Sequence, residues 1–273
     1  MARRHWTLDD LPWDRLDPSQ VDDGLVAIIK AAALVEYNGD DYATYLCNVF
    51  HDDPEFQQVA RDWAVEEIQH GQALGRWAEL VDPSWSLERA SRRFCDAYAL
   101  DLSADQSVRG SRSGELIARC MVETGTSSYY TALGDACREP VLKEICRHVA
   151  ADELRHYKLF YTYLRRYLEK EELGRLSRLR IALSRIMESE DDELARAYWA
   201  ANAAEGEDYD LARFSRAYMS RAYSYYRPGH VDRGMAMIFK AVGLKPQTRL
   251  FSAASRIAWW FMDRRLKGLA KAA

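Results

Sequence analysis

The chain contains the same helical hairpin pattern twice. With Glu36 aligned on Glu123, three further identities follow at an offset of 87 residues: Tyr42 with Tyr129, Thr44 with Thr131 and Leu46 with Leu133. After a one-residue slip at a turn, an offset of 86 aligns Pro54, Arg61, Glu67 and His70 with Pro140, Arg147, Glu153 and His156. One hairpin cannot bury its apolar face alone, whereas two copies about a pseudo-twofold axis form a four-helix bundle.

Composition supports an all-α fold. Only 14 Gly and 7 Pro occur in 273 residues, and Ala, Leu, Arg and Glu abound while runs of β-branched residues are scarce. We expect an irregular lead-in over 1–20, the bundle over 21–172 with hairpins 21–81 and 112–172, and a helical extension over 173–273. The helices are expected at 21–50, 54–81, 87–100, 112–137, 140–172, 173–204, 208–226, 230–242 and 247–269.

Each hairpin carries one Glu on its first helix and Glu-x-x-His on its second. The two sets are Glu36 with Glu67 and His70, and Glu123 with Glu153 and His156. Residues three apart share a helix face. At about 1.5 Å per residue, Glu36 and Glu67 lie roughly 25 and 21 Å from the turn at Asp53, and the second hairpin gives about 24 and 21 Å. All six side chains are therefore predicted to meet at one level of the bundle.

These six side chains interrupt apolar stripes instead of facing water. Trp63 and Leu74 flank Glu67 and His70 at helical spacing, although most helical glutamates are solvated. Four buried carboxylates would repel one another, and two divalent cations would neutralise their charge. Carboxylates mixed with imidazoles suit iron or manganese. The sequence therefore predicts a buried centre of two metal ions, Fe/Fe, with Mn/Fe and Mn/Mn left open.

At these residues the chain resembles the ferritin-like di-iron carboxylate superfamily, and within it the soluble acyl-carrier-protein (acyl-ACP) desaturases. The segment Trp63-Ala-Val-Glu-Glu-Ile-Gln-His70-Gly71 is similar to that family's W-x-x-E-E-x-R-H-G, and Asp152-Glu-Leu-Arg-His156 to its D-E-x-R-H. Gln69 departs from the pattern, where the family has Arg. The resemblance covers about residues 25–170 and implies that the six Glu and His side chains bind two irons.

Three neighbours are expected to support the centre. Asp152 is either an acceptor that fixes the tautomer of a ligand imidazole or an ordinary exposed acid. Thr126 stands where the resemblance places a Thr beside the oxygen site, with a bond to its own helix as the alternative. Trp63 is expected beside the ligands as a core residue in preference to an electron relay.

The resemblance implies an O2-activating oxidase or oxygenase that oxidises an unactivated C–H bond, acting on an acyl-ACP or another hydrophobic small molecule. No flavin, nicotinamide or iron-sulfur motif is present, so electrons are expected from a ferredoxin or reductase. Other enzymes remain open on this scaffold: an aldehyde-deformylating oxygenase, an arylamine N-oxygenase and a tRNA hydroxylase. A non-catalytic iron-handling protein, as in ferritins and rubrerythrins, is the alternative from another class.

Charge divides the chain into an acidic body and a basic tail. Residues 211–273 hold thirteen Lys or Arg and two Asp, a net +11 within a chain of net −4. Such a tail suits an acidic protein or a membrane surface, or is neutralised by the body itself; nucleic acid is not expected, and a homodimer is left open. A docking face for acyl carrier protein is predicted at five arginines: Arg213, Arg216, Arg221, Arg227 and Arg233.

The same sequence predicts a cytoplasmic location. Its apolar runs are shorter than the roughly 18 residues that span a bilayer, and its first residues lack an apolar signal core. The five cysteines contain no C-x-x-C pair and indicate neither a disulfide framework nor a zinc knuckle.

Overall fold

A computed structural model describes residues 5–188 and 192–272, with side chains to residue 269. Regular structure in these ranges is helical throughout, as predicted. Three short 3-10 turns span Leu8–Asp10, Trp13–Arg15 and Pro18–Gln20. The α-helices are α1 (Asp23–Tyr37), α2 (Gly39–Val49), α3 (Pro54–Val81), α4 (Leu87–Ala97), α5 (Arg112–Ala136), α6 (Pro140–Leu168), α7 (Arg175–Glu188), α8 (Glu193–Asn202), α9 (Leu211–Ser224), α10 (Pro228–Ala241) and α11 (Arg249–Ala272).

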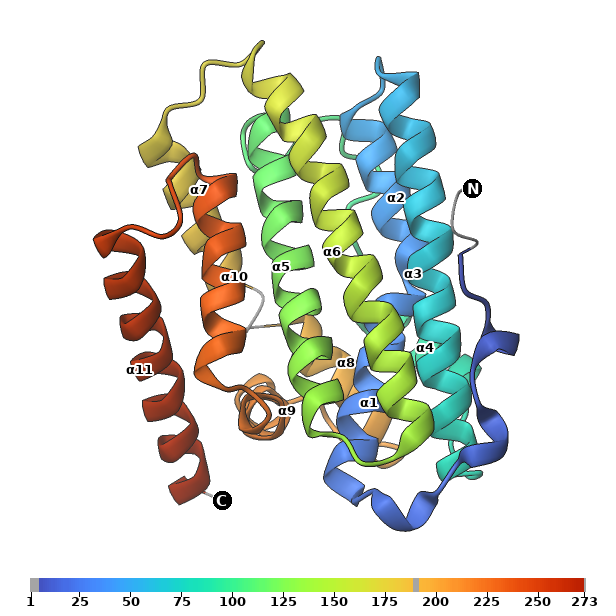
Figure 1. Cartoon of the computed structure of the whole chain (residues 1–273). Coiled ribbons are helices and arrows are strands. Elements are labelled where there is room, and N and C mark those ends of the chain that lie inside the picture. Colours follow the sequence, from blue (N-terminus) through green and yellow to red (C-terminus); the bar gives the residue numbers. More distant parts are fainter. Residues whose placement is uncertain (1–4, 189–191, 273) are drawn as a thin grey trace.

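Two long hairpins lie side by side in the centre of the fold (Figure 1). In the first, α1 and α2 pack on α3, and in the second, α5 packs on α6. Contacts between α3 and α6 join the two hairpins. The remaining helices surround this centre: α7 and α10 pack on α5, α8 and α9 pack on α1, and α11 lies outside α9 and α10. No helix in the described ranges is long and apolar enough to cross a bilayer.

The second helix of each hairpin begins at the Pro that the sequence predicts. Asp53 precedes Pro54, and its carboxylate accepts a hydrogen bond from the Phe56 N–H. Glu139 precedes Pro140, and its carboxylate accepts from the N–H groups of Val141 and Leu142. A side chain that caps the free N–H groups, followed by a residue with a fixed helical φ, fixes the start of a helix. Because both starts are fixed, the Glu-x-x-His segments lie at matching heights.

The expected continuous helix over 21–50 is wrong, because it breaks at Asn38. The side chain of Asn competes with helical hydrogen bonding, and α2 restarts at Gly39. Close packing on α3 holds the break in place. A Cβ at Gly39 would lie 3.0 Å from the Ala64 O, and a Cβ at Gly71 would lie 2.5 Å from the Tyr37 N. Gly39, directly after the break, and Gly71, on the facing helix α3, thus let the first hairpin pack closely next to Glu36.

Later boundaries also differ from expectation, among them the end of α4 at Ala97 instead of 100 and the start of α9 at Leu211 instead of 208. Helix α6 ends at Leu168 instead of about 172, and residues 169–174 form a short non-helical connection to α7. The segment 173–204 forms two helices, α7 and α8, where one piece was expected. The residues between their described ends, 189–191, lie outside the described ranges. None of these differences changes the four helices that carry the predicted ligands.

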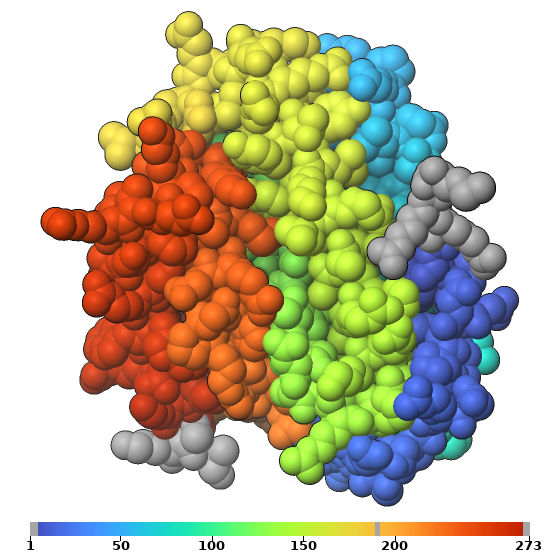
Figure 2. Space-filling view, in the orientation of Figure 1, coloured from blue at the N-terminus to red at the C-terminus, as the bar shows by residue number. Residues whose placement is uncertain are grey.

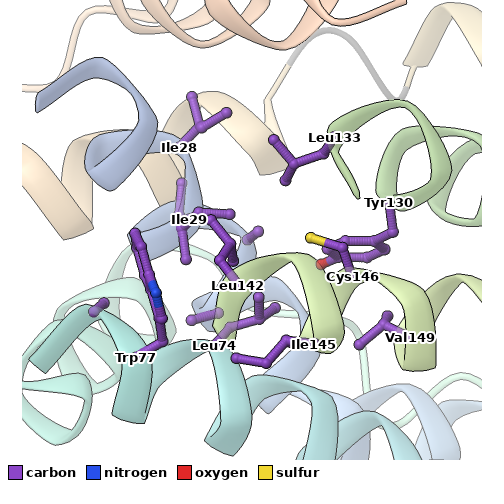
Figure 3. Close-up of a cluster of buried hydrophobic side chains, with 14 of the residues drawn as sticks. Ile28, Ile29, Leu74, Trp77, Tyr130, Leu133, Leu142, Ile145, Cys146 and Val149 are labelled. Atoms are coloured by element: carbon purple, nitrogen blue, oxygen red, sulfur yellow. The ribbon is translucent and has the colours of Figure 1, made fainter. Parts of the chain in front are cut away.

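The buried apolar side chains form two clusters with a polar layer between them. One cluster joins Ile28 of α1 and Leu74 of α3 to Tyr130 of α5 and Val149 of α6, and Figure 3 shows these side chains pointing toward one another. The other joins residues nearer the opposite end of the same helices, such as Phe56 and Phe160. Glu36, Glu67 and Glu153 fall between the two in sequence on their helices. The polar layer is therefore enclosed by dry side chains along the bundle axis.

Candidate metal centre

The six predicted ligands meet in the centre of the bundle. Their exposed fractions run from 0% for His70 to 7% for Glu67. Two groups of four have ligand atoms within 4.8 Å of one another: Glu36, Glu67, His70 and Glu153, and Glu67, Glu123, Glu153 and His156. The groups share Glu67 and Glu153. Two adjacent positions with common carboxylates are the arrangement in which carboxylates can bridge two ions.

Both imidazoles point the same type of nitrogen into the cluster. His70 Nδ1 lies 3.1 Å from Glu153 Oε1 and 3.8 Å from Glu36 Oε2. His156 Nδ1 lies 2.9 Å from Glu67 Oε1 and 3.7 Å from Glu123 Oε2. The ring centroids are 5.8 Å apart. The two Nδ1 atoms are therefore the nitrogen donors that the cluster offers to a cation.

The outer nitrogens are held by two further carboxylates. Asp152 Oδ2 lies 3.2 Å from His70 Nε2, and Glu66 Oε2 lies 2.6 Å from His156 Nε2. A carboxylate at Nε2 fixes the proton there and leaves the Nδ1 lone pair directed inward. The structure places Asp152 within hydrogen-bond distance of an imidazole, and Asp152 is buried instead of exposed.

Atoms that face the cluster lack hydrogen bonds within the described part of the chain. They are Glu67 Oε1, both carboxylate oxygens of Glu123, Glu153 Oε1 and the two imidazole Nδ1 atoms. Buried polar atoms are nearly always paired in folded proteins. Here the unpaired ones are all carboxylate oxygens or imidazole nitrogens, the donors that iron and manganese accept. The residues present thus fit a pair of such ions.

In the metal-free protein, two buried glutamates and both histidines of the cluster have raised pKa values. Burial and the neighbouring Glu153 raise the pKa of Glu67 well above its usual value, and the same two causes raise that of Glu123 to about 8. Burial alone would lower the pKa of His70, but the nearby carboxylates of Asp152 and Glu153 raise it. Burial would also lower the pKa of His156, but Glu123 and Glu66 raise it. Without metal, protons therefore occupy the cluster.

Arg155 links the two outer carboxylates. Its guanidinium donates to Asp152 Oδ1 at 2.6 Å and to Glu66 Oε2 at 2.9 Å. Burial opposes ionisation of Asp152, but hydrogen bonds from His70, Trp6 and Arg155 outweigh it and lower its pKa. Burial likewise opposes ionisation of Glu66, and His156 lowers the pKa of that group. Both outer carboxylates therefore remain ionised where they contact the imidazoles.

The N-terminal lead-in closes this network from outside. The Trp6 indole N–H donates to Asp152 Oδ2 at 2.7 Å, and its ring stacks on His70 with centroids 6.1 Å apart. His5 Nε2 lies 3.0 Å from the same Asp152 oxygen. Gln69 donates its amide N–H to the Trp6 carbonyl at 3.1 Å. The residue that departs from the desaturase pattern therefore holds a segment of the chain over the centre.

Sequence reasoning did not assign roles to Glu66, Trp6 and Arg155. A signal for Glu66 was present, because Glu66 and Asp152 coincide at the 86-residue offset of the repeat. Arg155 follows Asp152 by three residues and thus shares its helix face. Trp6 lies outside the repeat, in the segment expected to be an irregular lead-in, and no spacing rule connects it to residue 152.

Thr126 and Tyr130 each donate a hydrogen bond to one carboxylate of the cluster. The Thr126 hydroxyl donates to Glu153 Oε2 at 2.6 Å and also lies 3.2 Å from the Val122 carbonyl. Tyr130 donates to Glu36 Oε1 at 2.7 Å. In the repeat, Gly39 occupies the position of Thr126, so no hydroxyl from that position reaches Glu67. The pseudo-symmetric carboxylates Glu67 and Glu153 thus have different surroundings.

Trp63 is buried beside the centre, in the position expected of a core residue. Its ring meets Phe160 edge-on at a centroid distance of 5.4 Å and His156 at 6.4 Å. Its indole N–H has no hydrogen-bond partner among the described residues. The ring therefore limits the space on the His156 side of the cluster.

The five arginines of the predicted docking face have different surroundings. Arg221 pairs with Asp22 at 2.5 Å, and Arg213 pairs with Glu207. Arg227 donates to the carbonyls of Ser224 and Tyr226. Arg216 and Arg233 are exposed. Part of the basic tail is thus neutralised by acidic groups of the same chain.

Comparison with protein-family models finds no match to this chain, and no curated protein matches it. The functional assignment therefore depends on the arrangement of the side chains.

Proposed function

We propose that the cluster holds two iron ions in a ferritin-like four-helix bundle, and that the protein is an O2-activating oxidase or oxygenase of the acyl-ACP-desaturase type. The observation that carries the proposal is the set of unpaired buried atoms, which comprises carboxylate oxygens and both Nδ1 atoms directed at one another. Glu36, Glu67, His70 and Glu153 would hold one ion, and Glu67, Glu123, Glu153 and His156 the other. Manganese suits the same donors.

When bound and reduced, such a pair of ions supplies the oxidising power, drawn from O2, that breaks an unactivated C–H bond. The chain's own residues prepare the place for it. Asp152 and Glu66 keep the imidazole protons on Nε2, and Arg155 keeps those carboxylates charged. Thr126 and Tyr130 hold Glu153 and Glu36 in position. The two apolar clusters exclude water along the bundle axis, which protects a reactive oxidant from side reactions.

The desaturase-type assignment is supported by the roles of motif residues. Gly71 gives α1 the room to bring Glu36 beside His70, and Arg155 bridges the outer carboxylates. Thr126 contacts a ligand carboxylate at the position where the resemblance places a Thr. The two electrons that such a reaction consumes would come from an external ferredoxin or reductase, and the substrate would be a hydrophobic molecule or an acyl-ACP.

Metal stoichiometry tests the centre. After anaerobic reconstitution with ferrous iron and desalting, we expect two ions per chain by elemental analysis, and Glu123→Gln should lose at least one. Glu115→Gln is the matched control, since Glu115 is a buried glutamate of the same helix whose partners, Tyr45, Ser107 and Arg119, lie outside the cluster. Fewer than one ion per chain in the folded parent protein would overturn the proposal.

Oxygen consumption separates the enzyme from iron storage. The reduced, desalted protein should consume a limited amount of O2 per centre and then stop until it is reduced again. Continued oxidation and retention of many added ferrous ions per chain would overturn the oxygenase assignment and favour iron handling.

A further inference from the structure

The last helix, α11, has an apolar stripe that faces away from the fold, in addition to the side that packs on the protein. Leu250, Ile257 and Phe261 follow one another at spacings of seven and four residues and are exposed to 61%, 56% and 61%. The opposite side of the helix makes the contacts with the protein: Ser255 is buried, and the Phe251 ring meets Phe239 of α10 edge-on at 5.4 Å. The exposed stripe is therefore not used to dock α11 on its neighbours.

Cations flank this stripe. The sequence of α11 contains six Lys or Arg and one Asp. At 3.6 residues per turn, Arg264 and Arg265 lie on either side of the stripe, and Arg249 lies roughly a quarter turn away. The Arg264 guanidinium sits 5.3 Å from the ring centre of Trp260, which is 51% exposed. The outer face thus combines aliphatic and aromatic side chains with a border of positive charge.

This combination fits an anionic lipid surface. An interfacial helix buries its apolar stripe at the boundary between headgroups and acyl chains, while its cations contact the headgroups. Tryptophan prefers that boundary, and arginine can extend along apolar surface to reach headgroups. A second copy of α11 on the stripe would bring two helices with a sequence charge of +5 together, which is unfavourable.

The position of α11 also suits a flat surface. It is the outermost helix on its side of the fold, and the red C-terminal segment forms one side of the molecule in the space-filling view (Figures 1 and 2). A helix of 24 residues is about 36 Å long. The stripe from Leu250 to Phe261 covers about 16 Å of this length, and its side chains are more than half exposed, so a planar partner can reach them.

We propose that α11 binds the surface of anionic membranes, with Leu250, Ile257 and Phe261 inserted at the acyl boundary. The inference is independent of the metal centre. It also places a dry site for a hydrophobic substrate on a protein that meets lipid.

Sedimentation with vesicles tests this proposal on the full chain. We expect pelleting with phosphatidylcholine vesicles that contain 30% phosphatidylglycerol, little pelleting with pure phosphatidylcholine, and weaker pelleting as salt rises. The double variant Ile257→Glu/Phe261→Glu should lower vesicle affinity at least tenfold without changing helix content by circular dichroism. Leu80→Glu is the matched control, because Leu80 is an exposed apolar residue of α3, and it should bind like the parent.

Three outcomes would overturn the proposal. One is the absence of pelleting with the anionic vesicles at low salt. Another is equal pelleting of the double variant and the parent. The third is that another partner occupies the stripe. In that case the double variant would abolish a dimer seen in sedimentation velocity, or the binding of an acidic carrier protein, and would leave vesicle binding unaffected.

Discussion

Asp152 Oδ2 lies 3.2 Å from His70 Nε2, on the side of the imidazole opposite to Glu36, Glu67 and Glu153. The same oxygen accepts the indole N–H of Trp6, so one carboxylate joins the N-terminal segment to the centre. Glu66 has the corresponding position at His156. These two carboxylates decide which imidazole nitrogen is free for a cation.

We expect Asp152→Asn and Glu66→Gln each to weaken iron binding by about 10- to 100-fold, because the outer carboxylate orients the imidazole and raises its basicity. Competition with a coloured chelator measures the change. Asp62→Asn is the control, since Asp62 is an exposed carboxylate of α3. Equal affinity in the parent and both outer-carboxylate variants would show that the histidines do not need this support.

Gly71→Ala should destabilise the protein by about 1–3 kcal/mol, the usual cost of overpacking. The added Cβ would lie 2.5 Å from the Tyr37 N, so α1 must move and take Glu36 with it. Chemical denaturation gives the free energy of unfolding, and elemental analysis should show loss of metal. Gly125→Ala is the control, because an added Cβ there meets nothing within 4 Å and removal of a helical Gly should stabilise by roughly 0.5–1 kcal/mol.

The metal-free protein should lose stability as pH rises from 6 to 9. Its folded state holds protons on Glu67, Glu123, His70 and His156 more tightly than the unfolded chain does, because their pKa values are raised, to about 8 for Glu123. Raised pKa values stabilise the fold at low pH, and this contribution is lost as pH rises through them. Each 1 kcal/mol lost lowers Tm by about 2–4 °C.

Thermal unfolding by circular dichroism at several pH values checks this slope. The iron-loaded protein should show a smaller decline, because the metal ions replace those protons. Isothermal titration in buffers of different ionisation enthalpy should detect proton release on metal binding. A Tm of the metal-free protein that rises over the same range would contradict the prediction.

Thr126→Val should slow turnover or uncouple O2 consumption from substrate oxidation while both metal ions are retained. The substitution removes the hydroxyl that donates to Glu153 Oε2 at 2.6 Å and conserves side-chain volume. Thr126→Ser keeps the hydroxyl and should restore coupling. Loss of metal in the valine variant would assign Thr126 to ligand positioning and not to the reaction.

Periodicity predicts those features of the site that lie on regular helices. The fixed helix starts at Pro54 and Pro140 make counting along α3 and α6 reliable, and the six ligands meet as their heights predict. The break at Asn38 is held in place by the close approach of α1 to α3 at Gly71, which depends on tertiary packing. A periodic pattern carries no information on such an approach.

The outer network was only partly predictable for a related reason. Glu66 and Arg155 share helices with the ligands, so the repeat and the three-residue spacing could identify them. Trp6 reaches Asp152 across 146 residues, from a segment of short 3-10 turns without helical periodicity. Its position is determined by hydrogen bonds to Asp152 and Gln69, which no local pattern specifies.

Each group of four ligand side chains takes three from one hairpin and one glutamate from the other. One hairpin alone can therefore complete neither group, whereas two identical hairpins related by a twofold axis would supply both. A gene that encoded a single self-associating hairpin would thus already have specified the whole centre, and its tandem duplication would have preserved it. A single chain, unlike such a homodimer, can carry different residues at corresponding positions, as Gly39 and Thr126 do beside the predicted ligands.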